Sequence, residues 1–124
     1  RTSMFHHQMV IFMDYVARET QKRDRRFLYQ RRVMDGGTCE ATPYQLRGHV
    51  TGGIAIPLHN YHNQGRKRIG PEAVHLKDVE GAVRLLVEMV LRMEEFELPT
   101  RETLTRMADT WERYGPRLHQ KLKG

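Results

Sequence analysis

Residues 35–86 carry most of the information about the fold of this chain. They contain, in order, DGGTCEAT (35–42), VTGGIAIPL (50–58), HNYHN (59–63) and VHLKDVEGAVRLL (74–86). The first segment holds a glycine turn. The second predicts a buried strand, the third begins a polar loop over 59–71, and the last opens a helix over about 76–96. Ligands of open α/β sheets bind just outside the carboxyl ends of strands, so the histidines of this loop are candidate site residues.

Apolar spacing on either side of this stretch predicts further elements. Residues 4–22 form an amphipathic pattern of helical period, and FLYQ (27–30) is a β-prone run that predicts a strand. Residues 38–46 predict one or two helical turns. After Pro99 a further helix is expected, to be broken or kinked at Gly115-Pro116. Its apolar face is formed by Leu104, Met107, Ala108 and Trp111.

This order of elements predicts an α/β fold, a layered domain with a mostly parallel sheet flanked by helices. A chain of 124 residues suffices for one domain and not for two. We therefore expect a single domain over residues 1–124, with residues 97–124 as a helical C-terminal extension.

Composition narrows the class of protein and its partners. The net charge is 21 − 15 = +6, with an isoelectric point near 9.8. The basic residues do not form one long run, and no aromatic platform for nucleic acid is visible, so a solvated basic surface is the preferred interpretation. The single cysteine, Cys39, excludes an internal disulfide and indicates a reducing, cytoplasmic compartment. No apolar stretch approaches the ~20 residues that a membrane span requires.

Three groups of residues in the central stretch are candidates for chemistry. His59 and His62 have the residue type and loop position of metal ligands, although a pair of surface histidines is the simpler interpretation. The turn at 36–40 would let backbone approach a ligand closely. Cys39 could act as a nucleophile if a histidine activated it, but a small buried apolar residue is favoured. Glu72 is a loop carboxylate that could face the histidines.

Four consecutive features carry a resemblance to a known family. They are Gly36-Gly37-Thr38 in a GGTDA-type turn, Ile56-Pro57 at the end of an apolar run, His62 within an RYxHS-like loop, and DVEGAVRLL at 78–86. In this order the chain resembles the C-terminal part of the dinuclear-zinc aminopeptidases, namely the tetrahedral or glutamyl aminopeptidase family, formerly linked to cellulase activity. The resemblance covers roughly residues 4–96.

The resemblance implies roles for particular residues. His62 would be a zinc ligand, whereas His59 stands where the family has arginine and inherits no role. Substrate binding would fall to Gly37, Thr38, Cys39 and Glu40, with Cys39 replacing the aspartate of the family. A complete site would hold two divalent metal ions, taken as zinc. The remaining ligands and the general base are expected upstream of Arg1.

These implications define the expected function. The chain would supply the C-terminal part of the catalytic domain of a zinc-dependent, aminopeptidase-like hydrolase that acts on peptides. It would work as a homo-oligomer or with a chain that carries the missing N-terminal part, without membrane or nucleic acid. The first alternative is a non-catalytic remnant of the fold that acts by oligomerisation or peptide binding. The second is a basic nucleic-acid-binding module.

Overall fold

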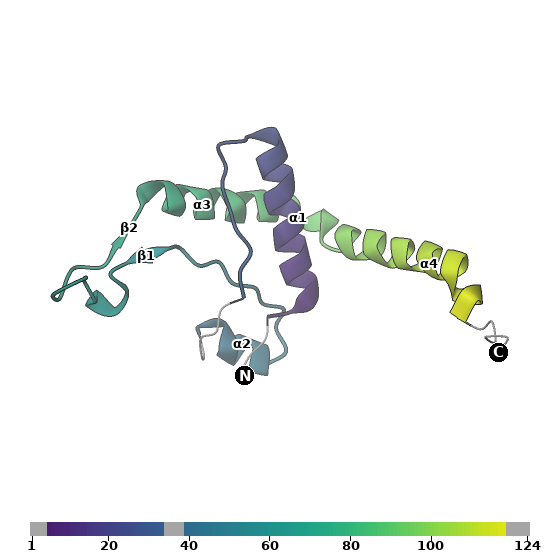
Figure 1. Cartoon of the computed structure of the whole chain (residues 1–124), viewed down its shortest axis with the longest axis horizontal. Helices are drawn as coiled ribbons and strands as arrows, with labels where there is room; N and C mark the ends of the chain where they lie inside the picture. The colour runs from purple at the N-terminus through teal and green to yellow at the C-terminus, as the bar shows by residue number, and fades with distance from the viewer. Residues whose placement is uncertain (1–4, 34–38, 119–124) are drawn as a thin grey trace, which may run out of the picture.

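The computed structural model describes residues 5–33 and 39–118, and these residues are mostly helical (Figure 1). The helices are α1 (His7–Arg23), α2 (Ala41–Leu46), α3 (Leu76–Leu91) and α4 (Leu98–Leu118), with short 3-10 turns η1 (Tyr61–Asn63) and η2 (Met93–Glu95). Strands β1 (Leu58–His59) and β2 (Ala73–Val74) pair antiparallel, with Leu58 opposite Val74.

The core lies where α1 crosses α3. Six buried apolar side chains form it: Phe12, Val16, Ala17, Phe27, Leu85 and Met89. Those of α1 recur at helical spacing, which places them on one face. Phe12, which is fully buried, also meets Phe96 edge-on at the start of the next helix, with ring centroids 5.4 Å apart. One aromatic side chain therefore joins α1, α3 and the approach to α4.

A polar network locks the corner between α3 and α4 onto α1. The Tyr15 hydroxyl donates to Glu95 Oε2 at 2.7 Å, and Arg92 Nη2 donates to the Tyr15 oxygen at 3.0 Å. Arg92 also forms an ion pair with Glu95 at 2.7 Å, and its guanidinium lies 4.9 Å from the centroid of the Tyr15 ring. These hydrogen bonds from Arg92 and Tyr15 lower the pKa of Glu95 from 4.5 to about 2.

Charged side chains join the far end of α1 to α3. Arg84 Nη1 donates to Asp24 Oδ2 at 2.8 Å, and Arg23 pairs with Glu88. The Arg84 guanidinium also lies 5.6 Å from the centroid of the Phe27 ring. The hydrogen bond from Arg84 lowers the pKa of Asp24 from 3.8 to about 2. The two helices are thus held by an apolar centre with ionic contacts at its edge.

The expectation of an α/β domain with a mostly parallel sheet is wrong. The described residues contain one sheet, which has two strands and is antiparallel. The expected strands over 27–30 and 50–58 are extended but unpaired, apart from the last residue of the second. A strand forms a ladder only if a neighbouring strand takes up its N–H and C=O groups, and the described chain offers segment 50–57 no such neighbour.

Segment 50–57 packs on side chains of α1 and the residue before it instead. An ideal Cβ at Gly52 would lie 2.5 Å from Met13 Sδ, and one at Gly53 would lie 2.5 Å from Phe5 Cζ. His6 N–H donates to the Thr51 carbonyl oxygen at 3.0 Å, which fixes the segment against the start of the helix. The apolar run therefore correctly predicted that this segment packs on other residues, but the prediction that it pairs with another strand is wrong.

Two helix boundaries differ from the sequence-based expectation. The helix expected over about 76–96 ends at Leu91 and continues as the 3-10 turn η2, where Arg92 turns toward Tyr15. α4 runs through Gly115-Pro116 without a break among the described residues. Pro116 lies in the last turn, where its missing N–H removes only one intrahelical hydrogen bond.

Large apolar side chains remain exposed outside this core. On α3 they are Leu76, Val83, Leu86, Val87, Val90 and Leu91, which are 51–73% exposed. Ile54, Ile56 and Leu58 are 36–37% exposed on the segment that precedes the loop. In the part of the chain that the structure describes, no helix combines the length and the apolarity needed to cross a bilayer.

Replacing Phe12 with Ala tests the apolar centre. We expect a loss of about 3–5 kcal/mol in the free energy of unfolding, because a fully buried aromatic side chain leaves a cavity. Leu28→Ala is the control: Leu28 is 80% exposed, so its truncation should change stability by less than about 0.5 kcal/mol. Urea unfolding followed by circular dichroism measures both. Equal effects of the two variants would contradict this core.

The depressed pKa of Glu95 predicts loss of stability in acid. Unfolding takes up the proton that the folded state excludes, so this stabilisation is present above about pH 5 and is lost as the pH falls towards 2. Glu95→Gln should flatten the pH dependence of the unfolding midpoint in this range. Glu102→Gln on α4, whose carboxylate is exposed, should leave it unchanged. The same slope in wild type and Glu95→Gln would refute a role for the network.

Candidate functional site

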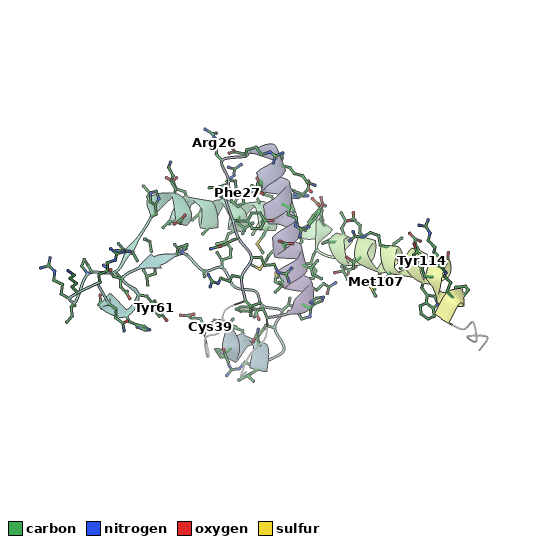
Figure 2. All side chains as sticks on the ribbon, in the orientation of Figure 1. Arg26, Phe27, Cys39, Tyr61, Met107 and Tyr114 are labelled. Atoms are coloured by element: carbon green, nitrogen blue, oxygen red, sulfur yellow. The ribbon has the colours of Figure 1, made fainter. Side chains whose placement is uncertain are left out.

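The residues between β1 and β2 form a closed loop, called here the His62 loop (residues 58–74). The two strands pair at its base, and Asn60 Nδ2 donates to the Pro71 carbonyl oxygen at 2.8 Å. Gly70 N–H donates to the Asn63 carbonyl oxygen at 3.0 Å. In Figure 2 Tyr61 lies in this loop, away from the α1–α3 core. The loop holds its shape by its own contacts.

The backbone of the His62 loop is strained at three residues. Asn60, His62 and Asn63 have φ values of 55°, 58° and 59°, in the left-handed region that side chains other than glycine disfavour. Asparagine tolerates this conformation better than histidine does. Such strain persists only where surrounding contacts enforce it, and it clusters at functional sites. His62 is therefore the residue of the loop whose conformation most needs an explanation.

His62 presents its imidazole to solvent. The side chain is exposed, and its ring centroid lies 4.0 Å from that of Tyr61 at an interplanar angle of 54°. Its backbone N–H donates to Glu72 Oε1 at 2.8 Å. Glu72, which was expected to face the histidines, accepts this hydrogen bond from the backbone of His62. The carboxylate thus fixes the position of His62 while the ring nitrogens stay accessible.

The His62 loop does not contain a complete metal site. Among residues 5–33 and 39–118, no three His, Cys, Asp or Glu side chains lie close enough together to hold a metal ion. Catalytic zinc usually has three protein ligands and a water molecule. His59, which lies opposite Ala73 in the sheet, is exposed and belongs to no such group.

Of the residues expected to bind substrate, the structure describes Cys39 and Glu40, which lie at the start of α2 and not in the His62 loop. Gly37 and Thr38 lie outside the described residues. Cys39 and Glu40 are exposed at the start of α2, where Cys39 N–H donates to Thr42 Oγ1 at 3.1 Å. Figure 2 shows Cys39 beside α2 and Tyr61 in the separate His62 loop. Because Cys39 is exposed, its interpretation as a buried apolar residue is wrong.

The tip of the His62 loop carries a charge cluster that the sequence interpretation missed. Arg66, Lys67 and Arg68 are all exposed there, and none forms an ion pair with another described residue. The tip turns tightly at Gly65, where a Cβ would lie 2.5 Å from the Arg68 carbonyl oxygen. The sequence GRKRIG (65–70), with three basic residues between two glycines, could have indicated this cluster.

Comparisons with known proteins give no assignment. No family model, no curated protein and no solved structure matches this chain. Its function must therefore be inferred from the geometry above and from the sequence resemblance.

Removing the carboxylate of Glu72 tests how His62 is positioned. In Glu72→Ala the His62 amide loses its acceptor, so we expect its hydrogen exchange to accelerate by about tenfold, the equivalent of one hydrogen bond of about 1.4 kcal/mol. Glu72→Gln retains an acceptor oxygen and should exchange within about threefold of wild type. Amide exchange by NMR measures both. Unchanged exchange in Glu72→Ala would show that other contacts hold this amide.

Proposed function

We propose that this chain is the C-terminal part of a metal-dependent, aminopeptidase-like hydrolase, to whose metal site it supplies His62. The observation that carries the proposal is the strained, internally cross-linked loop that presents an accessible imidazole. The sequence resemblance over residues 4–96 names the type of site.

The geometry of the His62 loop suits a metal ligand. A ligand must be held in one orientation before the metal arrives, and second-shell groups usually provide this. Here Glu72 holds the His62 backbone and Tyr61 lies against the ring. A loop residue without such constraints would leave the left-handed region, since that conformation is unfavourable for histidine. The constraint therefore favours a ligand over a solvated surface histidine.

The exposed apolar faces support a domain that is completed by other residues. One face of α3 packs on α1, and the other exposes Val83, Leu86, Val87 and Val90. A stripe of this width on a helix normally packs on a second layer. We propose that the missing N-terminal part of the catalytic domain forms this layer, carried by the same polypeptide or by a second chain.

Each group has a defined task in the proposed site. His62 would hold one of two divalent ions, taken as zinc, which when bound activate water and polarise the scissile carbonyl group. The turn with Gly37, Thr38, Cys39 and Glu40 would bind the peptide substrate. The other ligands and the general base would come from residues upstream of Arg1. The single cysteine favours a cytoplasmic location.

A basic nucleic-acid-binding module is the second candidate function, and the tip of the His62 loop favours it. Arg66, Lys67 and Arg68 would contact phosphates, with an affinity that falls steeply as salt rises. Filter binding at about 50 and 200 mM salt separates the two candidates. If nucleic-acid binding depends on salt and is lost when Arg66, Lys67 and Arg68 are all replaced with Ala, the module is supported. If binding is weak and unaffected by this triple variant, the module is dismissed. A non-catalytic remnant would show neither nucleic-acid binding nor metal uptake.

The chain alone and the complete assembly should differ in activity. The 124-residue chain should show no zinc-dependent hydrolysis of aminoacyl substrates, because His62 alone cannot hold two metal ions or supply a base. In the complete assembly, His62→Ala should abolish bound zinc and reduce hydrolysis by at least about a hundredfold, because losing even an outer-shell partner of a ligand costs about 10–100-fold. Metal analysis and a fluorogenic peptide assay measure these outcomes.

His59→Ala is the matched control for this experiment. His59 is exposed in the same loop and should leave both zinc content and hydrolysis unchanged. Circular dichroism of each variant should match wild type, because neither side chain contributes to the core. Full zinc content in His62→Ala, or chelator-sensitive turnover by the chain alone, would overturn the proposal.

A further inference from the structure

Helix α4 projects from the rest of the molecule. It leaves the core near η2 and extends away from α1 and α3 (Figure 1). Its 21 residues correspond to a length of about 31 Å. In proteins most of the stability of a helix comes from the packing of an amphipathic face. The question is which surface covers that face.

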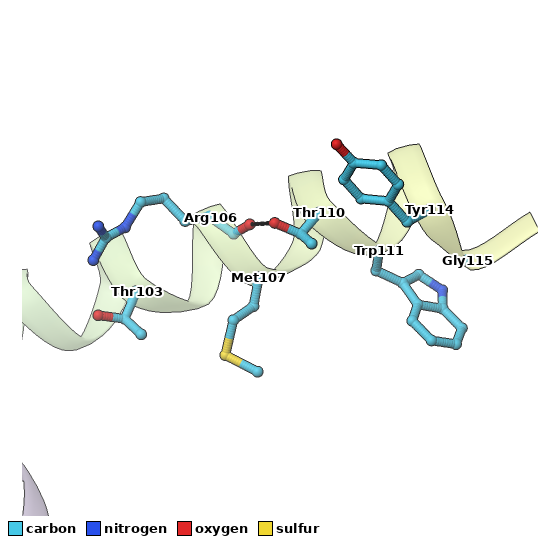
Figure 3. Close-up of a pocket in the computed structure, with 7 residues that line it drawn as sticks. All are labelled: Thr103, Arg106, Met107, Thr110, Trp111, Tyr114 and Gly115. Atoms are coloured by element: carbon cyan, nitrogen blue, oxygen red, sulfur yellow. Dashed lines mark hydrogen bonds between the residues drawn. The ribbon is translucent and has the colours of Figure 1, made fainter. Parts of the chain in front are cut away.

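Apart from Leu98 in its first turn, the large apolar residues described on α4 form one exposed stripe. They are Leu104, Met107, Trp111 and Tyr114, which are 60%, 63%, 60% and 47% exposed. Figure 3 shows three of them around a shallow concavity that Thr103, Arg106, Thr110 and Gly115 also line. A Cβ at Gly115 would lie 3.1 Å from Trp111 Cε2, so glycine lets the indole lie close along the helix.

The width of the stripe identifies the shape of its partner. Its four large residues follow a 3-4-3 spacing and cover an arc of roughly 80°, with the small side chain of Ala108 beside it. Helices that face a globular core carry a wider apolar face, whereas a seam restricted to alternating steps of three and four residues is typical of helix pairs. The exposed face of α3 is wider and includes adjacent residues Leu86 and Val87. α4 is therefore suited to a single helix and α3 to a broader layer.

We infer that α4 pairs antiparallel with α4 of a second copy of this chain. In this arrangement Leu104 faces Tyr114 and Met107 faces Trp111, so each layer sets a large aromatic side chain against a smaller one. A parallel pair would stack Trp111 on Trp111. α4 projects from the core (Figure 1), so an antiparallel pair would have the two cores at its opposite ends. This inference does not depend on the proposed metal site.

The residues beside the seam permit the two helices to approach. Ala108 and Thr110 would each lie across the two-fold axis from their own counterparts. Arg101 would lie opposite Gly115 and Arg117 opposite Thr103, so no like charges meet along the seam. The short side chains of Ala108 and Thr110 allow the two helices to come close. Because no two cations face each other, the main source of repulsion between identical helices is removed.

The area of the seam predicts a weak dimer. Trp and Tyr bury about 150–250 Å² each when fully covered, so two copies of the stripe and its rim reach roughly 1,000 Å². This is near the lower limit for a specific interface. Association should therefore depend on concentration within the range that sedimentation velocity covers.

Mass and tryptophan fluorescence together test the pairing. Trp111 is the single tryptophan of the chain, so its emission reports on the seam. On concentration, the 124-residue chain should double in mass while its emission shifts to shorter wavelength. Met107→Glu should abolish both changes. Thr105→Glu, which adds the same charge on the opposite side of α4, should retain both. A wild-type chain that stays monomeric, or two variants that behave alike, would overturn the inference.

Chemical cross-linking tests the orientation and does not require destabilising the seam. In a Cys39→Ser background, Thr110→Cys should be joined to its counterpart by a short bis-maleimide, because the two residues face each other across the axis only in the antiparallel pair. Thr105→Cys, on the outer side of α4, should not give a cross-linked dimer. Equal cross-linking of both positions would refute the antiparallel pairing. Zinc content and the state of His62 do not enter either measurement.

Discussion

The contact of Phe12 with α3 and with Phe96 is the interaction on which the rest of the structure depends. α1 is the only described element that touches both α3 and α4 closely, and Phe12 lies at that junction. The network of Tyr15, Arg92 and Glu95 fixes the direction in which the chain leaves α3. Because this corner is fixed, α4 projects away from the core, while the opposite end of α3 leads back to β2 and the His62 loop (Figure 1).

The periodicity of apolar residues was sufficient to predict the helices but not to predict the sheet. The apolar spacing of α1 reflects contacts that this helix makes with α3, so its prediction and the structure share one cause. In α3 most of the large apolar side chains are exposed, and only Leu85 and Met89 are buried. The run 50–58 has the composition of a buried strand, but a strand also needs a pairing partner, which composition does not encode. Gly52 and Gly53 allowed the backbone to lie on Met13 and Phe5 instead. The break expected at Gly115-Pro116 is absent from the described residues, where α4 continues for two residues beyond the proline to Leu118.

The candidate site could be located from sequence only in part. A polar loop with two histidines singled out the region of His62, and Glu72 was correctly named as a neighbour. Glu72 accepts a hydrogen bond from the backbone of His62, and this contact depends on left-handed φ values at three residues that are not glycine. No pattern of residues in the sequence predicts those φ values. The exposure of Cys39 and the clustering of Arg66, Lys67 and Arg68 at one tip likewise follow from where the loops turn.

The His62 loop closes over short chain separations, and this has a consequence for the order of events in folding. Glu72 is ten residues from His62, and Asn60 is eleven residues from Pro71, whereas Tyr15 and Glu95 are separated by 80. A loop of about ten residues closes in about 10–100 ns, while contacts between distant segments form more slowly. The loop can therefore form and re-form without waiting for the core. Its geometry is a local property of some fifteen residues, one that a short cyclic peptide spanning β1 to β2 would retain.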